Sequence, residues 1–79
     1  MNRPIANLWS TYAERVIPVH APKAQFVETK RAFYAGAHSL YNKITSAATE
    51  KEEDEVNDFL KAIEEDCALF CCEIKEGKA

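Results

Sequence analysis

The feature that most restricts the fold is a pair of long apolar rows, in which residues recur at alternating spacings of four and three. This spacing is typical of helices that pack along one stripe. The first row consists of Phe26, Lys30, Phe33, Ala37, Leu40, Ile44 and Ala47, and the second of Val56, Leu60, Ile63, Cys67, Phe70 and Ile74. Two helices joined by a short connection become antiparallel neighbours. Because few residues separate the rows, the sequence predicts a long antiparallel helical hairpin.

A shorter helix is predicted before the hairpin. Pro4 suits the first position of a helix, where its missing N–H costs nothing. An apolar stripe follows at three- and four-residue spacing, made of Ile5, Leu8, Trp9, Tyr12, Ala13 and Val16. Pro18 and Pro22 end this pattern, because each proline pushes the residue before it toward an extended conformation. We therefore expect one all-α domain over residues 1–79, with helices over about residues 4–16, 23–48 and 50–75.

The last predicted helix carries signals at both ends. Thr49 is followed three residues later by Glu52, which is the pattern of a capping box. The carboxylates within residues 50–55 favour the positive end of the helix dipole. Gly77 is a natural helix terminator. The sequence thus predicts a helix capped by Thr49 and ended by Gly77.

A chain of 79 residues buries only about 60% of the surface that its unfolded form exposes, so its core needs support. The three cysteines, Cys67, Cys71 and Cys72, do not have the spacing of a disulfide framework. Cys67 and Cys71 share a helix face, but the usual spacings of zinc ligands are missing, and no metal is expected. Oligomerisation is the remaining support. We expect a homo-oligomer in which dimerisation completes a helical bundle.

The net charge of −3 hides an asymmetry between the two parts of the chain. Residues 1–48 have a net charge of +4, and residues 49–79 have a net charge of −7. One interpretation is a basic helix beside an acidic helix, and the other is two surfaces for different partners. The acidic run is an ordinary solvated face or an imitation of a phosphate backbone. Nucleic acid is not an expected partner, because the chain is acidic overall and has no helix-turn-helix or arginine-rich arm.

Apolar runs in this sequence are short. None approaches the ~20 residues that a membrane-spanning helix needs. The first ten residues also lack the apolar stretch of a signal peptide. We therefore expect a protein of the cytoplasm that does not associate with membranes.

Neither histidine points to catalysis. His20 lies between prolines, and His38 follows a run of small residues from Ala35 to Ala37. No serine or cysteine nucleophile is tied to either histidine by spacing, and no carboxylate is placed to orient them. The sequence predicts no enzyme and no cofactor.

Aromatic and basic residues cluster in the first part of the chain. The candidate ligand-binding residues are Trp9, Tyr12, Lys30, Arg31 and Tyr34. Aromatic faces beside Lys or Arg hold a nucleotide by stacking and by charge on its phosphate. The alternative is an ordinary aromatic core with basic residues at its rim. Lys30 keeps the binding interpretation open, because a lysine in an apolar row is costly unless it reaches solvent, an acid or a ligand.

The same part of the chain carries a recognisable motif. Trp9 and Tyr12 are followed by the proline-containing connector and then by the run Arg31-Ala32-Phe33-Tyr34-Ala35-Gly36-Ala37. This combination resembles small uncharacterised proteins of tailed bacteriophages, and the resemblance covers about residues 8–45. It implies an accessory protein of a phage or prophage, a class that often acts against host defences.

The sequence and the resemblance together lead to two functional hypotheses. The first is a non-catalytic binding protein, a counter-defence factor that sequesters a nucleotide signal or binds and inhibits a host protein. The second is a structural or assembly protein whose hairpin dimerises or docks on a larger complex.

Overall fold

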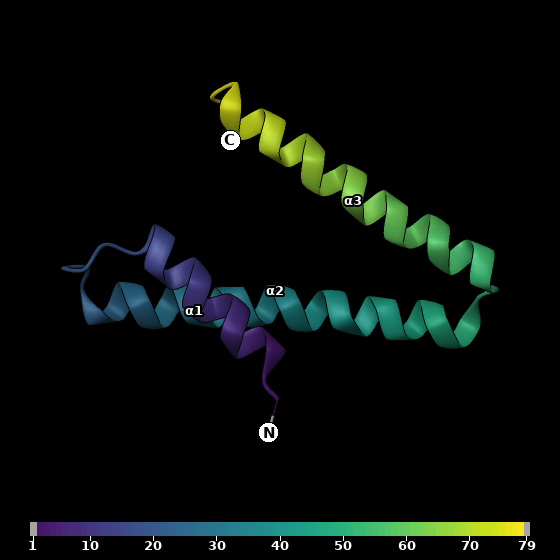
Figure 1. Cartoon of the computed structure of the whole chain (residues 1–79), viewed down its shortest axis with the longest axis horizontal. Coiled ribbons are helices and arrows are strands. Elements are labelled where there is room, and N and C mark those ends of the chain that lie inside the picture. The colour runs from purple at the N-terminus through teal and green to yellow at the C-terminus, as the bar shows by residue number, and fades with distance from the viewer. Residues whose placement is uncertain (1, 79) are drawn as a thin grey trace. The chain divides into compact units, whose positions relative to one another are not determined.

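In the computed structural model, which describes residues 2–78, the chain is all-α, as predicted. It consists of α1 (Pro4–Val16), α2 (Lys23–Glu50) and α3 (Glu53–Lys75), and no strand occurs in the described part (Figure 1). The chain forms two compact units, a first one up to Tyr41 and a second one from Asn42 onward. The boundary between them falls within α2. The antiparallel hairpin and the dimer remain predictions.

Helix α1 begins and ends where its prolines require. Pro4 occupies the first turn, and the amide of Asn7 donates to the carbonyl of Arg3, at 3.1 Å. Ile17 is extended, with φ −93° and ψ 120°, because the ring of Pro18 disfavours the helical conformation at the preceding residue. The connector makes one turn, in which Ala21 N–H donates to the carbonyl of Pro18 at 3.0 Å. The chain is thereby turned directly into α2.

The core of the first unit is an aromatic cluster around Trp9, whose side chain comes from α1. Only 5% of Trp9 is exposed. Its ring lies edge-on to Phe26 and Phe33 of α2, with centroid separations of 5.5 and 5.4 Å. Tyr12 extends the cluster, at 5.2 Å from Phe33 and 6.0 Å from Trp9. These contacts hold α1 against the first part of α2, because aromatic pairs at such separations attract each other beyond simple burial.

The predicted capping box at Thr49 is wrong. Thr49 lies inside α2, and its hydroxyl donates to the carbonyls of Thr45 and Ser46, at 3.2 and 3.1 Å. Because Thr49 continues α2, it does not stand directly before α3, where a capping side chain would accept from the first N–H groups of that helix. Glu52, with an extended backbone (φ −68°, ψ 157°), takes the cap position of α3 without a side-chain cap.

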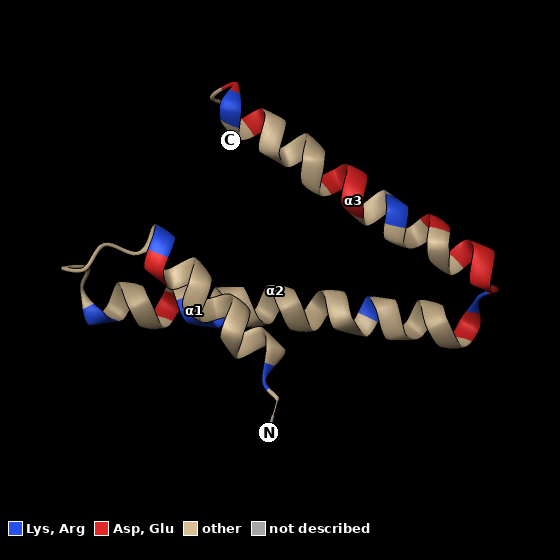
Figure 2. Ribbon diagram, viewed as in Figure 1, with Lys and Arg blue, Asp and Glu red and all other residues tan. Residues whose placement is uncertain are grey.

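Acidic residues fill the first turn of α3, as expected for the positive end of a helix dipole. Figure 2 shows them gathered along the first half of this helix. The other end of α3 closes as predicted at Gly77, which has a φ of +77°. Lys78 N–H donates to the carbonyl of Glu73 at 2.8 Å, and Gly77 N–H donates to that of Ile74 at 3.1 Å. These two bonds form a Schellman motif, which satisfies the last carbonyls of the helix.

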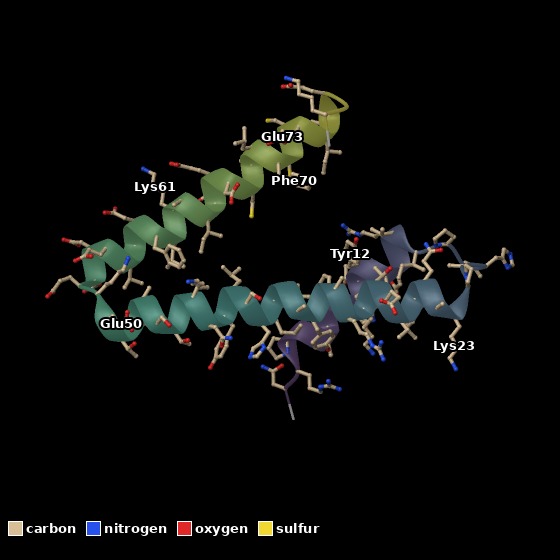
Figure 3. The ribbon with its side chains drawn as sticks, turned by 180° about the vertical axis from the view of Figure 1, so that it is seen from behind. Tyr12, Lys23, Glu50, Lys61, Phe70 and Glu73 are labelled. Carbon is tan, nitrogen blue, oxygen red and sulfur yellow. The ribbon has the colours of Figure 1, made fainter. Side chains whose placement is uncertain are left out.

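The second unit has little core of its own. Ala47, near the end of α2, is buried, and Phe59 of α3 lines a hollow together with it. None of the residues of α3 is buried. Val56, Phe59 and Ile63 are half-buried, whereas Leu69, Phe70 and Ile74 are exposed; Figure 3 draws the side chains of this helix. Within residues 2–78, no helix combines the length and the apolar character needed to cross a membrane.

Candidate ligand-binding site in the first unit

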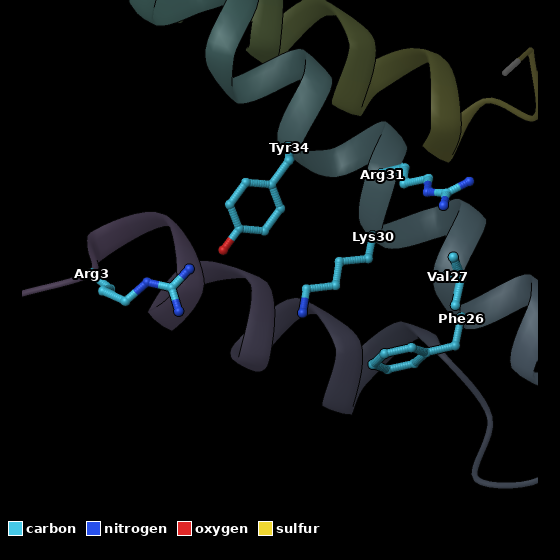
Figure 4. A pocket seen from close by; sticks show the side chains of 6 residues that line it. All are labelled: Arg3, Phe26, Val27, Lys30, Arg31 and Tyr34. Carbon is cyan, nitrogen blue, oxygen red and sulfur yellow. The ribbon is translucent and has the colours of Figure 1, made fainter.

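A shallow hollow of about 410 Å³ lies between α2 and the residue that precedes α1. Six side chains line it: Arg3, Phe26, Val27, Lys30, Arg31 and Tyr34 (Figure 4). Five of the six come from successive turns of α2, because residues three and four apart share one face of a helix. Arg3 reaches the hollow from the start of α1. The site therefore depends on the packing of α1 on α2.

The hollow is basic. Of the six side chains that line it, three are cationic and none is acidic. In Figure 4, the Lys30 ammonium group, the Arg3 guanidinium group and the Tyr34 hydroxyl group point toward a common space. Lys30 is exposed and makes no ion pair with the described residues. This geometry leaves two cations and one hydroxyl available to an anionic ligand.

Arg31 has a lesser place in the hollow. Its guanidinium group lies 3.8 Å from Glu28, one turn earlier on α2. Both side chains are well exposed, so the attraction between them is weak. Figure 4 shows Arg31 pointing away from Lys30 and Tyr34. Arg31 therefore belongs to the rim of the hollow.

The structure divides the five candidate residues into two groups. Lys30, Arg31 and Tyr34 line the hollow. Trp9 and Tyr12 do not line it and belong to the aromatic cluster between α1 and α2. Trp9 still supports the site, since it packs against Phe26, which forms one wall.

Three lining residues were not among the candidates from the sequence. Phe26 belonged to the first apolar row, and Val27 lies seven residues before Tyr34, so helix periodicity placed both near the site. Arg3 had no such signal. It reaches the hollow only because α1 crosses the first part of α2.

A second hollow, of about 430 Å³, adjoins the first and is almost wholly apolar. It is lined by Pro4, Ile5, Tyr34, Ala37, His38 and Tyr41. Tyr34 forms a wall of both hollows, and it also borders a third, smaller one beside Arg3 and Pro4. A basic surface and an apolar surface thus meet at one aromatic ring.

In the part of the chain that the structure describes, no group of three or more His, Cys, Asp or Glu side chains is arranged to hold a metal ion. The three cysteines are exposed on α3 and unpaired. His38 lines the apolar hollow and His20 lies in the connector, and both are exposed.

Comparisons of the chain with protein-family models, with curated proteins and with solved structures gave no match.

Proposed function

We propose that the first unit binds a phosphate-bearing small molecule of the nucleotide type and does not transform it. The observation that carries this proposal is the convergence of Arg3, Lys30 and the Tyr34 hydroxyl on one hollow without an acidic residue. Lys and Arg hold phosphate oxygens by charge-assisted hydrogen bonds, which are about twice as strong as neutral ones. A carboxylate in the lining would have opposed such a ligand.

The size of the site and its neighbour fit a nucleotide better than a bare phosphate ion. Pockets for small molecules usually measure roughly 300–1,000 Å³, and the basic hollow falls in this range. Tyr34 and Phe26 supply aromatic surface beside the cations, as a nucleobase or ribose requires. The adjoining apolar hollow offers further surface for the part of the ligand that carries no charge.

The biological role that we propose is sequestration. A protein that holds a nucleotide signal lowers its free concentration without any chemical step. The resemblance of residues 8–45 to small tailed-phage proteins supports a counter-defence role in the cytoplasm of an infected host. In this role the ligand is a signal that the host makes to trigger its defence. Binding and inhibition of a host protein is the other form that this role takes.

Titration calorimetry with three probes tests the proposal. Adenosine diphosphate contains phosphate and base, pyrophosphate contains only the charged part, and adenosine contains only the base and sugar. We expect adenosine diphosphate and pyrophosphate to bind, and adenosine to bind much more weakly. Loss of a hydrogen bond to a charged group costs about 1.5–3 kcal/mol, so Lys30→Ala should weaken binding by about tenfold or more.

Matched controls lie on the same helices. Lys23→Ala removes a cation from the start of α2, and Arg15→Ala removes one from the end of α1, and neither residue lines the hollow. Both control variants should bind as the parent chain does, whereas Arg3→Ala should resemble Lys30→Ala. The proposal is wrong if no phosphate-bearing probe binds, or if the controls weaken binding as much as Lys30→Ala.

The second candidate function, that of a structural or assembly protein, is favoured by a different observation. Leu69, Phe70 and Ile74 of α3 are all exposed. Exposed apolar side chains grouped on one element are typical of an interface. Sizing with light scattering separates this candidate from a pure sequestering protein, because a monomer that binds nucleotide would not need the apolar surface of α3.

A further inference from the structure

The basic hollow and the apolar hollow, which share Tyr34, follow one another along one face of α2. Lys30, Tyr34 and His38 are four residues apart in turn, so they form one row on the helix surface. The basic hollow lies at the Lys30 end of this row and the apolar hollow at the His38 end. From Lys30 to Tyr41, the last residue of α2 that lines the apolar hollow, the distance along the helix axis is about 16 Å. An extended nucleoside diphosphate has a similar length.

The apolar hollow offers a ligand few polar groups. Three of its six lining side chains contain no donor or acceptor: Pro4, Ile5 and Ala37. Tyr34 directs its hydroxyl group toward the basic hollow (Figure 4). His38 and Tyr41 remain, and both are exposed, Tyr41 to 62%. Their polar atoms therefore stay in contact with water whether or not a ligand pairs with them.

We propose that the apolar hollow holds the nucleobase and ribose of the ligand without selecting among the bases. This inference rests on the proposed function, in which the basic hollow holds the phosphates. A site rejects a wrong base strongly, by about 10⁴–10⁵, only when that base leaves a buried donor or acceptor of the site unpaired. None of the side chains that line the apolar hollow is both polar and buried. The penalty that would distinguish one base from another is therefore missing.

The apolar hollow recognises aromatic and apolar surface instead. Tyr34 and Tyr41 are seven residues apart and share a face of α2, so both rings border the same space. Every nucleobase has a flat aromatic face, and stacking on aromatic side chains tolerates all of them. The phosphates thus define the ligand class, and the chain is suited to hold several nucleotide signals. All residues that line the two hollows belong to the first unit.

Titration calorimetry of the full chain with four nucleoside diphosphates tests the lack of selection. Adenosine and guanosine diphosphate are nearly equal in size and differ in the polar edge of the base, and the same holds for cytidine and uridine diphosphate. We expect the dissociation constants within each pair to differ by less than about tenfold. Methyl diphosphate, which has the charged part but no base, should bind more weakly than any of the four.

A substitution in the apolar hollow tests where the base lies. Tyr41→Ala removes an aromatic wall, so it should lower the ratio of adenosine diphosphate affinity to methyl diphosphate affinity about fivefold or more. Leu40→Ala is the matched control, because Leu40 precedes Tyr41 on α2, is 41% exposed and lines neither hollow. It should leave this ratio as it is in the parent chain.

Each part of the inference has its own contrary result. A preference of more than about tenfold within either pair would overturn the lack of selection. Nucleotides that bind no more tightly than methyl diphosphate, or an equal fall of the ratio in Tyr41→Ala and Leu40→Ala, would overturn the placement of the base. Failure of the proposed function looks different, because in that case neither the nucleotides nor methyl diphosphate nor pyrophosphate would bind.

Discussion

Trp9 is the side chain on which the first unit depends most, and its replacement by alanine gives the sharpest test of the packing. The ring is 5% exposed and stands between Tyr12, Phe26 and Phe33, at centroid separations of 5.4 to 6.0 Å. Truncating a buried tryptophan to alanine costs about 3–5 kcal/mol. Phe26 and Tyr12 are themselves partly exposed, so they have room to move into the space that the indole ring leaves. We therefore expect a loss of stability at the lower end of this range, about 3 kcal/mol.

A loss of this size is large for so short a unit. Proteins are stable by about 0.05–0.15 kcal/mol per residue, which gives about 2–6 kcal/mol for the residues up to Tyr41. Trp9→Ala should therefore leave α1 detached from α2 for much of the time. The basic hollow would lose Arg3 and its Phe26 wall together, so nucleotide binding should fall with the packing.

Amide hydrogen exchange read by mass spectrometry measures this effect locally. Peptides from α1 should exchange about 100-fold faster in Trp9→Ala than in the parent chain, since 1.4 kcal/mol corresponds to a factor of ten. Peptides from α3 should change little, because that helix belongs to the other unit. Val19→Ala is the control, as Val19 is 95% exposed in the connector. Exchange in α1 within threefold of the parent, or an equal change in α3, would refute the reasoning.

Three further predictions concern single backbone positions. Gly36→Ala should stabilise the chain against urea by about 0.5–1 kcal/mol, because a Cβ at Gly36 meets no atom within 4 Å; a loss of stability would instead show that another helix sits on this position. Gly77→Ala should cost about 1–2 kcal/mol and speed amide exchange in the last turn of α3, since its φ of +77° strains any residue with a side chain. Thr49→Ala should leave the free energy of unfolding in urea within about 0.5 kcal/mol of the parent, whereas a capping role would predict a loss of about 1 kcal/mol.

The sequence predicted the elements well because proline and periodicity act locally. Pro4 begins α1, and Pro18 makes Ile17 extended, so that the helix ends at Val16. The junction between α2 and α3 was predicted less well, for an equally local reason. Whether Thr49 continues α2 or stands directly before α3 depends on its backbone conformation, which the sequence does not contain.

Of the residues that line the candidate site, the sequence predicted only ones that lie on a single helix, α2. Lys30 and Tyr34 are four residues apart on α2, so their shared face follows from the helix alone. Arg3 lies 27 positions before Lys30 and joins the hollow through the crossing of α1 over α2, which spacing does not encode. The same crossing uses Trp9 for packing, although its aromatic face had suggested ligand contact.

Tyr34 forms a wall of three hollows at once, and this makes them thermodynamically linked. A rotation of its ring that widens the basic hollow takes space from the apolar one. Two separate ligands in these hollows should therefore oppose each other, and by reciprocity each should weaken the other by the same factor. A single ligand long enough to occupy both hollows would escape this penalty, since it sets the ring once for its whole length.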